Sequence, residues 1–240
     1  VLNLPEPIFK DEYVELDKDQ LKLYNKIKED VQKSKQYTSM VTMQSLIANP
    51  SVEFIKARQA VACPHIFGIR HDAKLERTIE LLEEAFENGK SVVIFGFFNE
   101  TIYQYERVLS EKFKGSVLAV TPETKNAQDI ISEFQNETKP MAIIGSIGKL
   151  GTSFTITRAD VVIYVDTHVI YTDYKQAYYR VWRQGQTKAV LIIHLLAKDT
   201  MDERLQDLIY FGKSKQDQVV DGKDSDEYLI KKYGRLEDYL

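Results

Sequence analysis

Two arginines three residues apart are the side chains of this chain best suited to chemistry. Arg180 and Arg183 lie within the stretch Gln176–Gln186, which reads QAYYRVWRQGQ. The spacing predicts a helix with both side chains on one face. A guanidinium is always charged and offers a planar set of donors, which suits the γ-phosphate of a nucleotide and the charge of its transition state. For two arginines taken alone, a solvated helix face is the favoured interpretation. The flanking Gln176, Ala177, Gly185 and Gln186 favour phosphoryl-transfer chemistry instead.

The composition sets broad limits on the class of protein. The chain has 240 residues, of which 43% are hydrophobic and 28% charged, as in ordinary globular domains. Its formal net charge of −4 leaves nucleic-acid binding open, because a local groove can supply the phosphate contacts. Cys63 is the only cysteine, so no internal disulfide can form and we expect a reducing, cytoplasmic compartment.

Other classes of protein find little support in the sequence. No apolar run reaches about 18 residues, so we expect no membrane-spanning helix and no membrane partner. The four histidines lack metal-ligand spacing, and with a single cysteine no metal site is expected. No Gly-x-Ser-x-Gly elbow and no Gly-x-Gly-x-x-Gly loop occurs, which argues against a serine hydrolase and a dinucleotide site. Because the chain begins with Val1 and not Met, we expect a fragment of a longer protein.

Short apolar runs rich in β-branched residues alternate with amphipathic segments in the second half of the chain. The predicted strands are Val92–Phe95, Val117–Val120, Met141–Ile144, Val161–Val165 and Val190–Leu195. One predicted helix runs from Asp17 to about Ser34, and a second opens at His71–Asp72–Ala73 and ends before Gly89. Further helices are predicted over Glu100–Phe113, Lys125–Phe134, Thr172–Arg183, Met201–Phe211 and Asp226–Tyr233, and Val14–Leu16 is predicted to be extended. Such alternation is typical of a parallel sheet with helices on both faces.

The predicted domain organisation follows from this alternation. We expect one α/β domain over residues 1–240, with a parallel sheet, helices on both faces and a helical N-terminal extension. Its parts are the extension at 1–70, the α/β core at 71–200, and C-terminal helices or a brace at 201–240. Ligands of such sheets bind at the carboxyl ends of the strands. The candidate binding loops therefore follow Phe95, Val120, Ile144 and Val165.

The arginine stretch resembles motif VI of the Swi/Snf-type ATPases of helicase superfamily two, Q-A-x-x-R-x-H-R-x-G-Q, with Trp182 at the usual histidine. Other segments resemble further motifs in the family's order. Val92–Phe98 is similar to motif IV, with Phe97 in place of Gln, and Gly151–Thr157 is similar to motif V. Lys188–Arg204 resembles the strand and closing helix that follow motif VI, so the resemblance spans nearly the whole chain.

This resemblance implies the C-terminal RecA-like lobe of a DNA translocase, and we expect the fragment itself to be monomeric. The residues it implies for ATP binding are Gln176, Gly151, Arg180 and Arg183, the two arginines being catalytic and presented at the ligand-binding edge of the sheet. DNA, expected as a duplex, would be contacted by small and polar residues after the strands. These are Gly96, Phe97, Thr121, Ser146, Gly148, Lys149, Thr152 and Ser153.

The sequence lacks the parts that hold most of a nucleotide. A P-loop needs Gly-x-x-x-x-Gly-Lys-Ser/Thr, but Glu84 and Asp207 stand at the first glycine position before the two Gly-Lys-Ser triplets. Asp202 and Glu203 are expected in the first turn of a helix and not as a Mg²⁺ pair. The resemblance thus implies that ATP and Mg²⁺ are held mainly by an N-terminal RecA-like lobe of the same protein. Alone, this chain is expected to be inactive as an ATPase.

The alternative is a standalone α/β module that binds nucleic acid or a protein partner without nucleotide chemistry. Its support is the set of departures from the family pattern, at Phe97, Ala127, Ser153 and Val169–Tyr171. A P-loop and an Asp-Glu box upstream of Val1 in the same reading frame would favour the motor. Their absence would favour the module.

Overall fold

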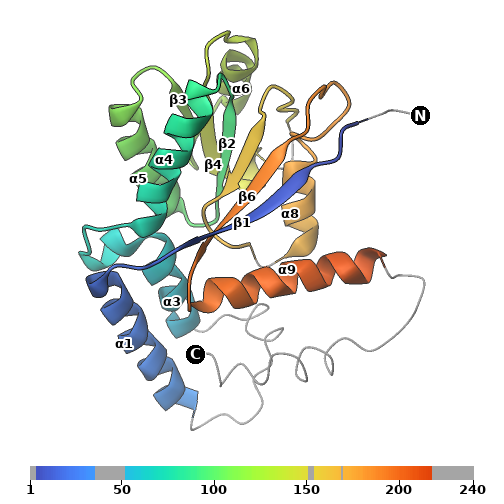
Figure 1. Ribbon diagram of the computed structural model, residues 1–240. Helices are drawn as coiled ribbons and strands as arrows, with labels where there is room; N and C mark the ends of the chain where they lie inside the picture. The colour runs from blue at the N-terminus through green and yellow to red at the C-terminus, as the bar shows by residue number, and fades with distance from the viewer. Residues whose placement is uncertain (1–3, 36–51, 151–153, 169, 218–240) are drawn as a thin grey trace.

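Among the described residues, six parallel strands form one sheet (Figure 1). The structure is a computed structural model that describes residues 4–35, 52–150, 154–168 and 170–217. In spatial order the strands are β1 (Ile8–Val14), β6 (Leu191–Ala197), β5 (Val161–Tyr164), β2 (Val92–Gly96), β4 (Ala142–Ser146) and β3 (Val117–Val120). Every described pairing is parallel, so the carboxyl ends of all strands meet at one edge. The predicted parallel α/β sheet is confirmed.

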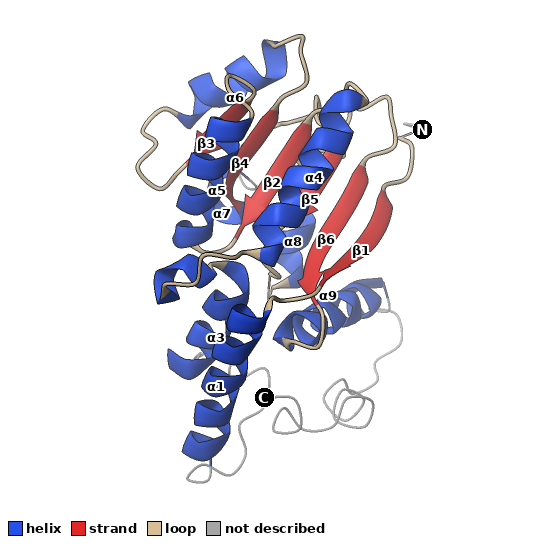
Figure 2. Cartoon of the chain, turned by 60° about the vertical axis from the view of Figure 1, so that its left-hand side comes forward, coloured by secondary structure: helices blue, strands red, loops and turns tan. Residues whose placement is uncertain are grey.

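Helices cover both faces of this sheet, as predicted (Figure 2). One face is packed by α3 (Val52–Ala62), α4 (Ala73–Glu87) and α5 (Asn99–Lys112), and the other by α6 (Ala127–Asn136), α7 (Ile147–Leu150) and α8 (Tyr171–Tyr178). Helix α1 (Lys18–Lys35) packs on α3, a short 3-10 turn η1 (Pro64–Phe67) follows α3, and α9 (Met201–Asp217) crosses the end of β6. The sheet therefore has two buried sides.

The alternation of side chains in β2 supplies both cores. Every residue of β2 is buried, which is why the run VVIFG carries no polar side chain. Ile94 packs in the core with α4 and α5, whereas its neighbour Val93 packs in the core with α6, α7 and α8. Successive side chains of a strand point to opposite faces. A strand buried on both faces must therefore read as a continuous apolar run.

The N-terminal region differs from the prediction. Residues 1–70 were expected to be a helical extension with Val14–Leu16 extended, but Ile8–Val14 form an edge strand paired with β6 from Leu191 to Ala197. The sequence signal is weak because an edge strand is covered on one side only. Ile8 and Tyr13 are exposed, and charged residues stand between them, so no apolar run marks the strand. Edge strands commonly carry such charged side chains.

Some predictions fall outside the described residues. These are the predicted site residues Gly151, Thr152 and Ser153, the departure at Val169, the helix at Asp226–Tyr233 and the brace beyond Asp217. Among the helices that the structure describes, none combines the length and the apolar character needed to cross a lipid bilayer.

Gly145 occupies a point of close approach near the end of β4. A Cβ placed there would lie 2.7 Å from Leu150 Cδ1 and Cγ and 3.0 Å from the carbonyl oxygen of Val120. Helix α7 begins directly after β4 and folds back over it, so the absence of a side chain lets Leu150 pack against the strand.

We predict that Gly145→Ala lowers the free energy of unfolding by about 1–3 kcal/mol, because the added methyl group overpacks the core. Gly148→Ala is the matched control, since its Cβ would find only Ser146 Oγ, at 3.9 Å. Urea denaturation of both variants measures the difference. Equal stability of the two variants would contradict the close packing of α7 on β4.

Candidate functional site

The carboxyl ends of three neighbouring strands bring most of the predicted DNA-binding residues together. Gly96 at the end of β2 pairs in register with Ser146 at the end of β4, and β3 ends on the other side of β4. The residues at or just after these ends, which we call the carboxyl-edge surface, are Phe97, Thr121, Ser146, Gly148 and Lys149. Phe97, Gly148 and Lys149 are exposed, whereas Gly96 is buried. Direct contact between Gly96 and DNA is thus disfavoured.

Hydrogen bonds order the strand-end segments of the carboxyl-edge surface, and one of them connects two segments. The hydroxyl of Thr124 accepts from the backbone N–H of Thr121 at 2.9 Å, and Ser146 Oγ accepts from the N–H of Lys149 at 3.1 Å. Lys149 Nζ donates to the carbonyl oxygen of Pro122 at 3.3 Å. An ammonium group has three donors. The surface can therefore present a positive charge and hydroxyl groups to a phosphate.

A buried carboxylate, Asp166, fixes the backbone behind this surface. One carboxylate oxygen of Asp166 accepts from the backbone N–H groups of Phe97 and Phe98, at 2.8 and 3.1 Å, and the other accepts from Thr101 Oγ1 at 3.4 Å. Burial raises the pKa of Asp166, while the charge of Lys74 and the two amides oppose the rise. Asp166 thus ties the end of β5 to the turn between β2 and α5.

Two buried cations complete this polar cluster. Lys74 Nζ donates to the carbonyl oxygen of Val165 at 3.0 Å and forms an ion pair with Asp202. Arg58 Nη2 donates to the carbonyl oxygen of Thr167 at 2.8 Å. Burial lowers the pKa of Arg58, although an arginine stays charged in proteins. Carbonyl oxygens and carboxylates at the carboxyl edge therefore compensate both charges.

Sequence reasoning assigned no role to Lys74 or Arg58. In each helix, the sequence contains a pattern from which a buried charged side chain could have been inferred. Lys74 stands one turn before Thr78 on the inward side of α4, and Arg58 lies among the small apolar residues Ala57 and Val61 of α3. A charged side chain on the buried face of a helix implies a buried partner.

Asp72 is a third acidic residue in this region that the sequence analysis did not single out. Its Oδ1 accepts from the N–H of Leu75 at 3.0 Å and so caps α4. Its Oδ2 is buried and has no hydrogen-bond partner within the described part of the chain. Burial raises the pKa of Asp72 to about 7, opposed by the amide of Leu75 and the charge of Lys74.

The two arginines do not lie on a helix, contrary to the prediction. Helix α8 ends at Tyr178, and turns follow in which Arg180 N–H donates to Ala177 at 3.1 Å. The carbonyl oxygen of Arg180 instead accepts from the N–H of Ile156 at 2.8 Å. Pairing with the segment before β5 thus replaces the helical hydrogen bonds, a case of tertiary contacts overriding local spacing.

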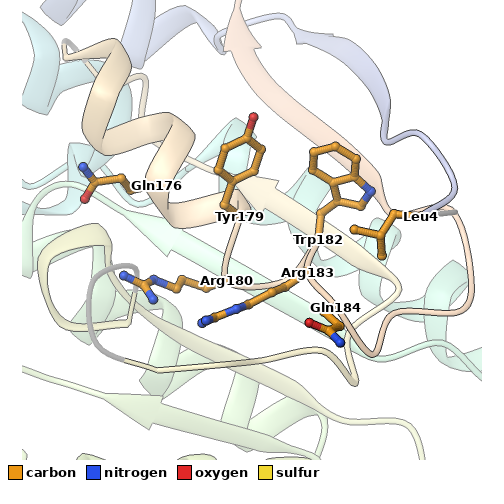
Figure 3. A pocket seen from close by; sticks show the side chains of 7 residues that line it. All are labelled: Leu4, Gln176, Tyr179, Arg180, Trp182, Arg183 and Gln184. Atoms are coloured by element: carbon orange, nitrogen blue, oxygen red, sulfur yellow. The ribbon is translucent and has the colours of Figure 1, made fainter. Parts of the chain in front are cut away.

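The arginines nevertheless line one pocket, of about 400 Å³ (Figure 3). We call it the arginine pocket; its lining residues are Leu4, Gln176, Tyr179, Arg180, Trp182, Arg183 and Gln184. Arg183 is exposed, and its Nη1 donates to Thr155 Oγ1 at 3.2 Å. Figure 3 shows both guanidinium groups extending away from the ring of Trp182. The predicted nucleotide residues Gln176, Arg180 and Arg183 are therefore brought together.

The arginine pocket lies away from the carboxyl edge, contrary to the prediction. Eight residues of α8, about 12 Å of helix, separate the carboxyl end of β5 from the pocket. On the far side, Trp182 Nε1 donates to the carbonyl oxygen of Pro5 at 2.7 Å, and Pro5 precedes β1. The pocket therefore lies toward the amino ends of the strands. The crossover helix carries the arginines from one edge of the sheet toward the other.

No metal-binding cluster accompanies either surface in the described residues. Within that part of the chain, no group of three or more His, Cys, Asp or Glu side chains could hold a metal ion. We therefore assign no metal ligand within those residues.

A parallel sheet with helices on both faces and polar strand ends is the architecture of doubly wound α/β domains, of which a RecA-like lobe is one kind. The helicase conserved C-terminal domain matches residues 73–185. An ATP-dependent helicase of Mycoplasma genitalium, described as uncharacterized, is 28% identical over 206 residues, which cover 84% of this chain and 20% of the relative. The chain thus spans about a fifth of the length of this relative and of a second ATP-dependent helicase, from Mycoplasma pneumoniae.

Solved structures agree with the sequence relatives. The SWI2/SNF2 ATPase core domain of Sulfolobus solfataricus superposes with a TM-score of 0.72 and 25% identity, covering 95% of this chain and 48% of that chain. The same core in complex with dsDNA gives a TM-score of 0.72 at 24% identity, covering 90% and 46%. These matches support a C-terminal RecA-like lobe of the Swi/Snf-type, helicase-related ATPases.

The buried carboxyl of Asp72 predicts a pH-dependent stability. Its pKa of about 7 in the folded chain exceeds the ordinary value of 3.8, so the folded state holds more protons between these values. The free energy of unfolding must then fall as the pH rises through this window. Asp72→Asn keeps a capping oxygen but cannot ionise, and we expect its stability to fall less from pH 5 to pH 8 (about the span of the titration).

Urea denaturation at several pH values measures this effect. Asp19→Asn, an exposed change in the first turn of α1, is the control and should keep the wild-type slope. Part of the slope should survive in Asp72→Asn, because burial also raises the pKa of Asp166. An Asp72→Asn profile that coincides with the wild type would contradict the assignment.

Proposed function

We propose that this chain is the C-terminal motor lobe of an ATP-dependent DNA translocase, with separate surfaces for nucleotide and DNA. The observation that carries the proposal is the arginine pocket, in which Arg180, Arg183 and Gln176 of the family motif line one cavity. ATP-dependent helicase relatives and a fold shared with a SWI2/SNF2 core bound to dsDNA support it. The residue roles below extend this proposal.

Arg180 and Arg183 would meet the γ-phosphate of an ATP held by an N-terminal lobe. Their guanidinium groups stabilise negative charge on the transferring phosphoryl group, and an arginine finger contributes about 10³–10⁵ in rate to such reactions. The hydrogen bond from Arg183 to Thr155 holds one guanidinium beside the pocket before the nucleotide arrives. Preorganisation of this kind lowers the reorganisation needed at the moment of reaction. Gln176 and Gly151 would complete the nucleotide contacts.

The carboxyl-edge surface would bind the DNA backbone. Lys149 supplies charge, and Thr121 and Ser146 supply hydroxyl groups, while Thr152 and Ser153 are assigned from the family motif. Phosphate contacts of this type fix position without reading sequence. Closure of the cleft on ATP and its reopening after hydrolysis would move the two lobes relative to each other along a duplex, by a hinge motion.

The nucleotide itself would be held mainly by the N-terminal lobe of the same protein. The sequence carries no P-loop, and the described residues include no group of three or more His, Cys, Asp or Glu side chains that could hold a metal ion. We therefore expect this chain alone to lack ATPase activity. That it is monomeric and cytoplasmic remains a separate part of the proposal. The domain division proposed from sequence, with a core at 71–200 and a C-terminal brace at 201–240, remains a proposal.

We predict that Arg183→Ala lowers DNA-stimulated ATP hydrolysis at least tenfold in the two-lobed protein (a cautious bound for an arginine finger), while DNA binding survives. DNA binding should survive because Arg183 lies outside the carboxyl-edge surface. Steady-state ATPase assays and DNA titrations measure the two effects. Arg107→Ala, an exposed arginine change on α5, is the matched control and should leave turnover unchanged. Unchanged turnover in Arg183→Ala would refute the finger assignment.

A further inference from the structure

The carboxyl-edge surface carries an aromatic ring whose chemistry does not suit a phosphate. Phe97 follows β2 directly, and its side chain is 38% exposed, whereas the next residue, Phe98, is 8% exposed. A phenyl ring has no hydrogen-bond donor and no charge. The neighbouring residues that we propose contact DNA suit its phosphates. Phe97 therefore needs a ligand group other than a phosphate.

The backbone of Phe97 is held in place by a buried anion. Asp166 accepts hydrogen bonds from the N–H groups of both Phe97 and Phe98. These bonds fix the turn, so that Phe98 packs beside Ala62 and Cys63 while Phe97 points to the surface. The exposed ring therefore sits on a rigid strand end, and holding it there adds little conformational entropy cost on binding.

The Phe97 ring is also supported from beneath. The guanidinium carbon of Arg58 lies 4.2 Å from the Phe97 ring centroid and 5.0 Å from that of Phe98. Phe98 meets the Phe97 ring edge-on at a centroid distance of 5.0 Å, and the ring of His168 lies 5.6 Å away. Arg58 is itself 7% exposed and bonded to Thr167. A buried cation against an aromatic ring is a favourable arrangement that holds the ring in one orientation.

We propose that Phe97 is a stacking platform for an unpaired nucleobase, so that this lobe prefers duplex DNA with locally unpaired bases over fully paired duplex. The proposal rests on the proposed function, because the phosphate contacts of the neighbouring strand ends must bring DNA to the ring. Inside a duplex each base face is covered by its neighbours. An unpaired base offers a free π-face, and stacking on an aromatic side chain tolerates any base.

The neighbouring side chains supply the charge and the hydrogen-bond donors that the Phe97 ring lacks. Ser146 stands at the end of the strand next to β2, and Lys149 follows one turn later. Backbone contacts from Lys149 and stacking on Phe97 together resemble the combination of positive charge and aromatic platforms used for single strands. A contact between Phe97 and another protein lobe is the rival explanation, and it predicts no dependence on unpaired bases.

The test compares two DNA probes of equal length and charge, a fully paired duplex and the same duplex with a short central bubble, bound to the 240-residue chain. We expect the bubble to bind about tenfold more tightly. Phe97→Leu keeps an apolar side chain without a π-face and should reduce this ratio to near one. Phe97→Trp should preserve the ratio, and its indole fluorescence should be quenched by the bubble. The wild-type chain, whose only tryptophan is Trp182, is the fluorescence control.

A second variant separates the proposal from the function on which it rests. Lys149→Ala should weaken both probes alike and keep their ratio, because a phosphate contact does not depend on base pairing. The stacking platform is refuted, and the DNA surface retained, if Lys149→Ala weakens duplex binding but the wild-type chain binds the bubble and the paired duplex equally well. If the chain binds neither probe, or binds both without dependence on Lys149, the proposed DNA surface itself fails. Circular dichroism of each variant checks that the fold is retained.

Discussion

The buried carboxylate of Asp166 is the interaction on which the carboxyl edge of this lobe depends. It lies two residues beyond β5 and accepts the amides that start the turn after β2. An isolated buried charge is costly, and removing one partner of a buried pair typically costs about 3–5 kcal/mol. Lys74 compensates the charge and is itself paired with Asp202, whose Oδ2 also accepts from the N–H of Ala197. The ends of β5 and β6 and the starts of α4 and α9 are thereby joined in one polar network.

The two sites that we propose for nucleotide and DNA lie apart in space. Asp166 organises the carboxyl edge, and a few residues later the chain enters α8, which leads to the arginine pocket near the amino ends of the strands. Nucleotide and DNA would therefore meet the same β5–α8 unit at its two ends. A rigid crossover helix between them offers a physical route by which closure on a nucleotide could move the edge that holds DNA, without a shared residue.

The sequence predicted what depends on burial and missed what depends on partners distant in the chain. The central strands were found because burial on both faces demands continuous apolar runs, and the motif at Arg180 and Arg183 was found because its residue types and spacing are specific. Strand β1 was missed because one side of an edge strand stays polar. The end of α8 was misplaced because Ile156, far away in sequence, takes the carbonyl of Arg180. The position of the arginines relative to the strand ends likewise depends on where the crossover helix stops.

Hydrogen–deuterium exchange of the chain with and without duplex DNA tests the two-surface account most directly. The account predicts slower exchange at the backbone amides of residues 97–98, 121–124 and 146–149, with no change over residues 179–186. Slower exchange over 179–186, with the amides of the carboxyl edge unaffected, would contradict it.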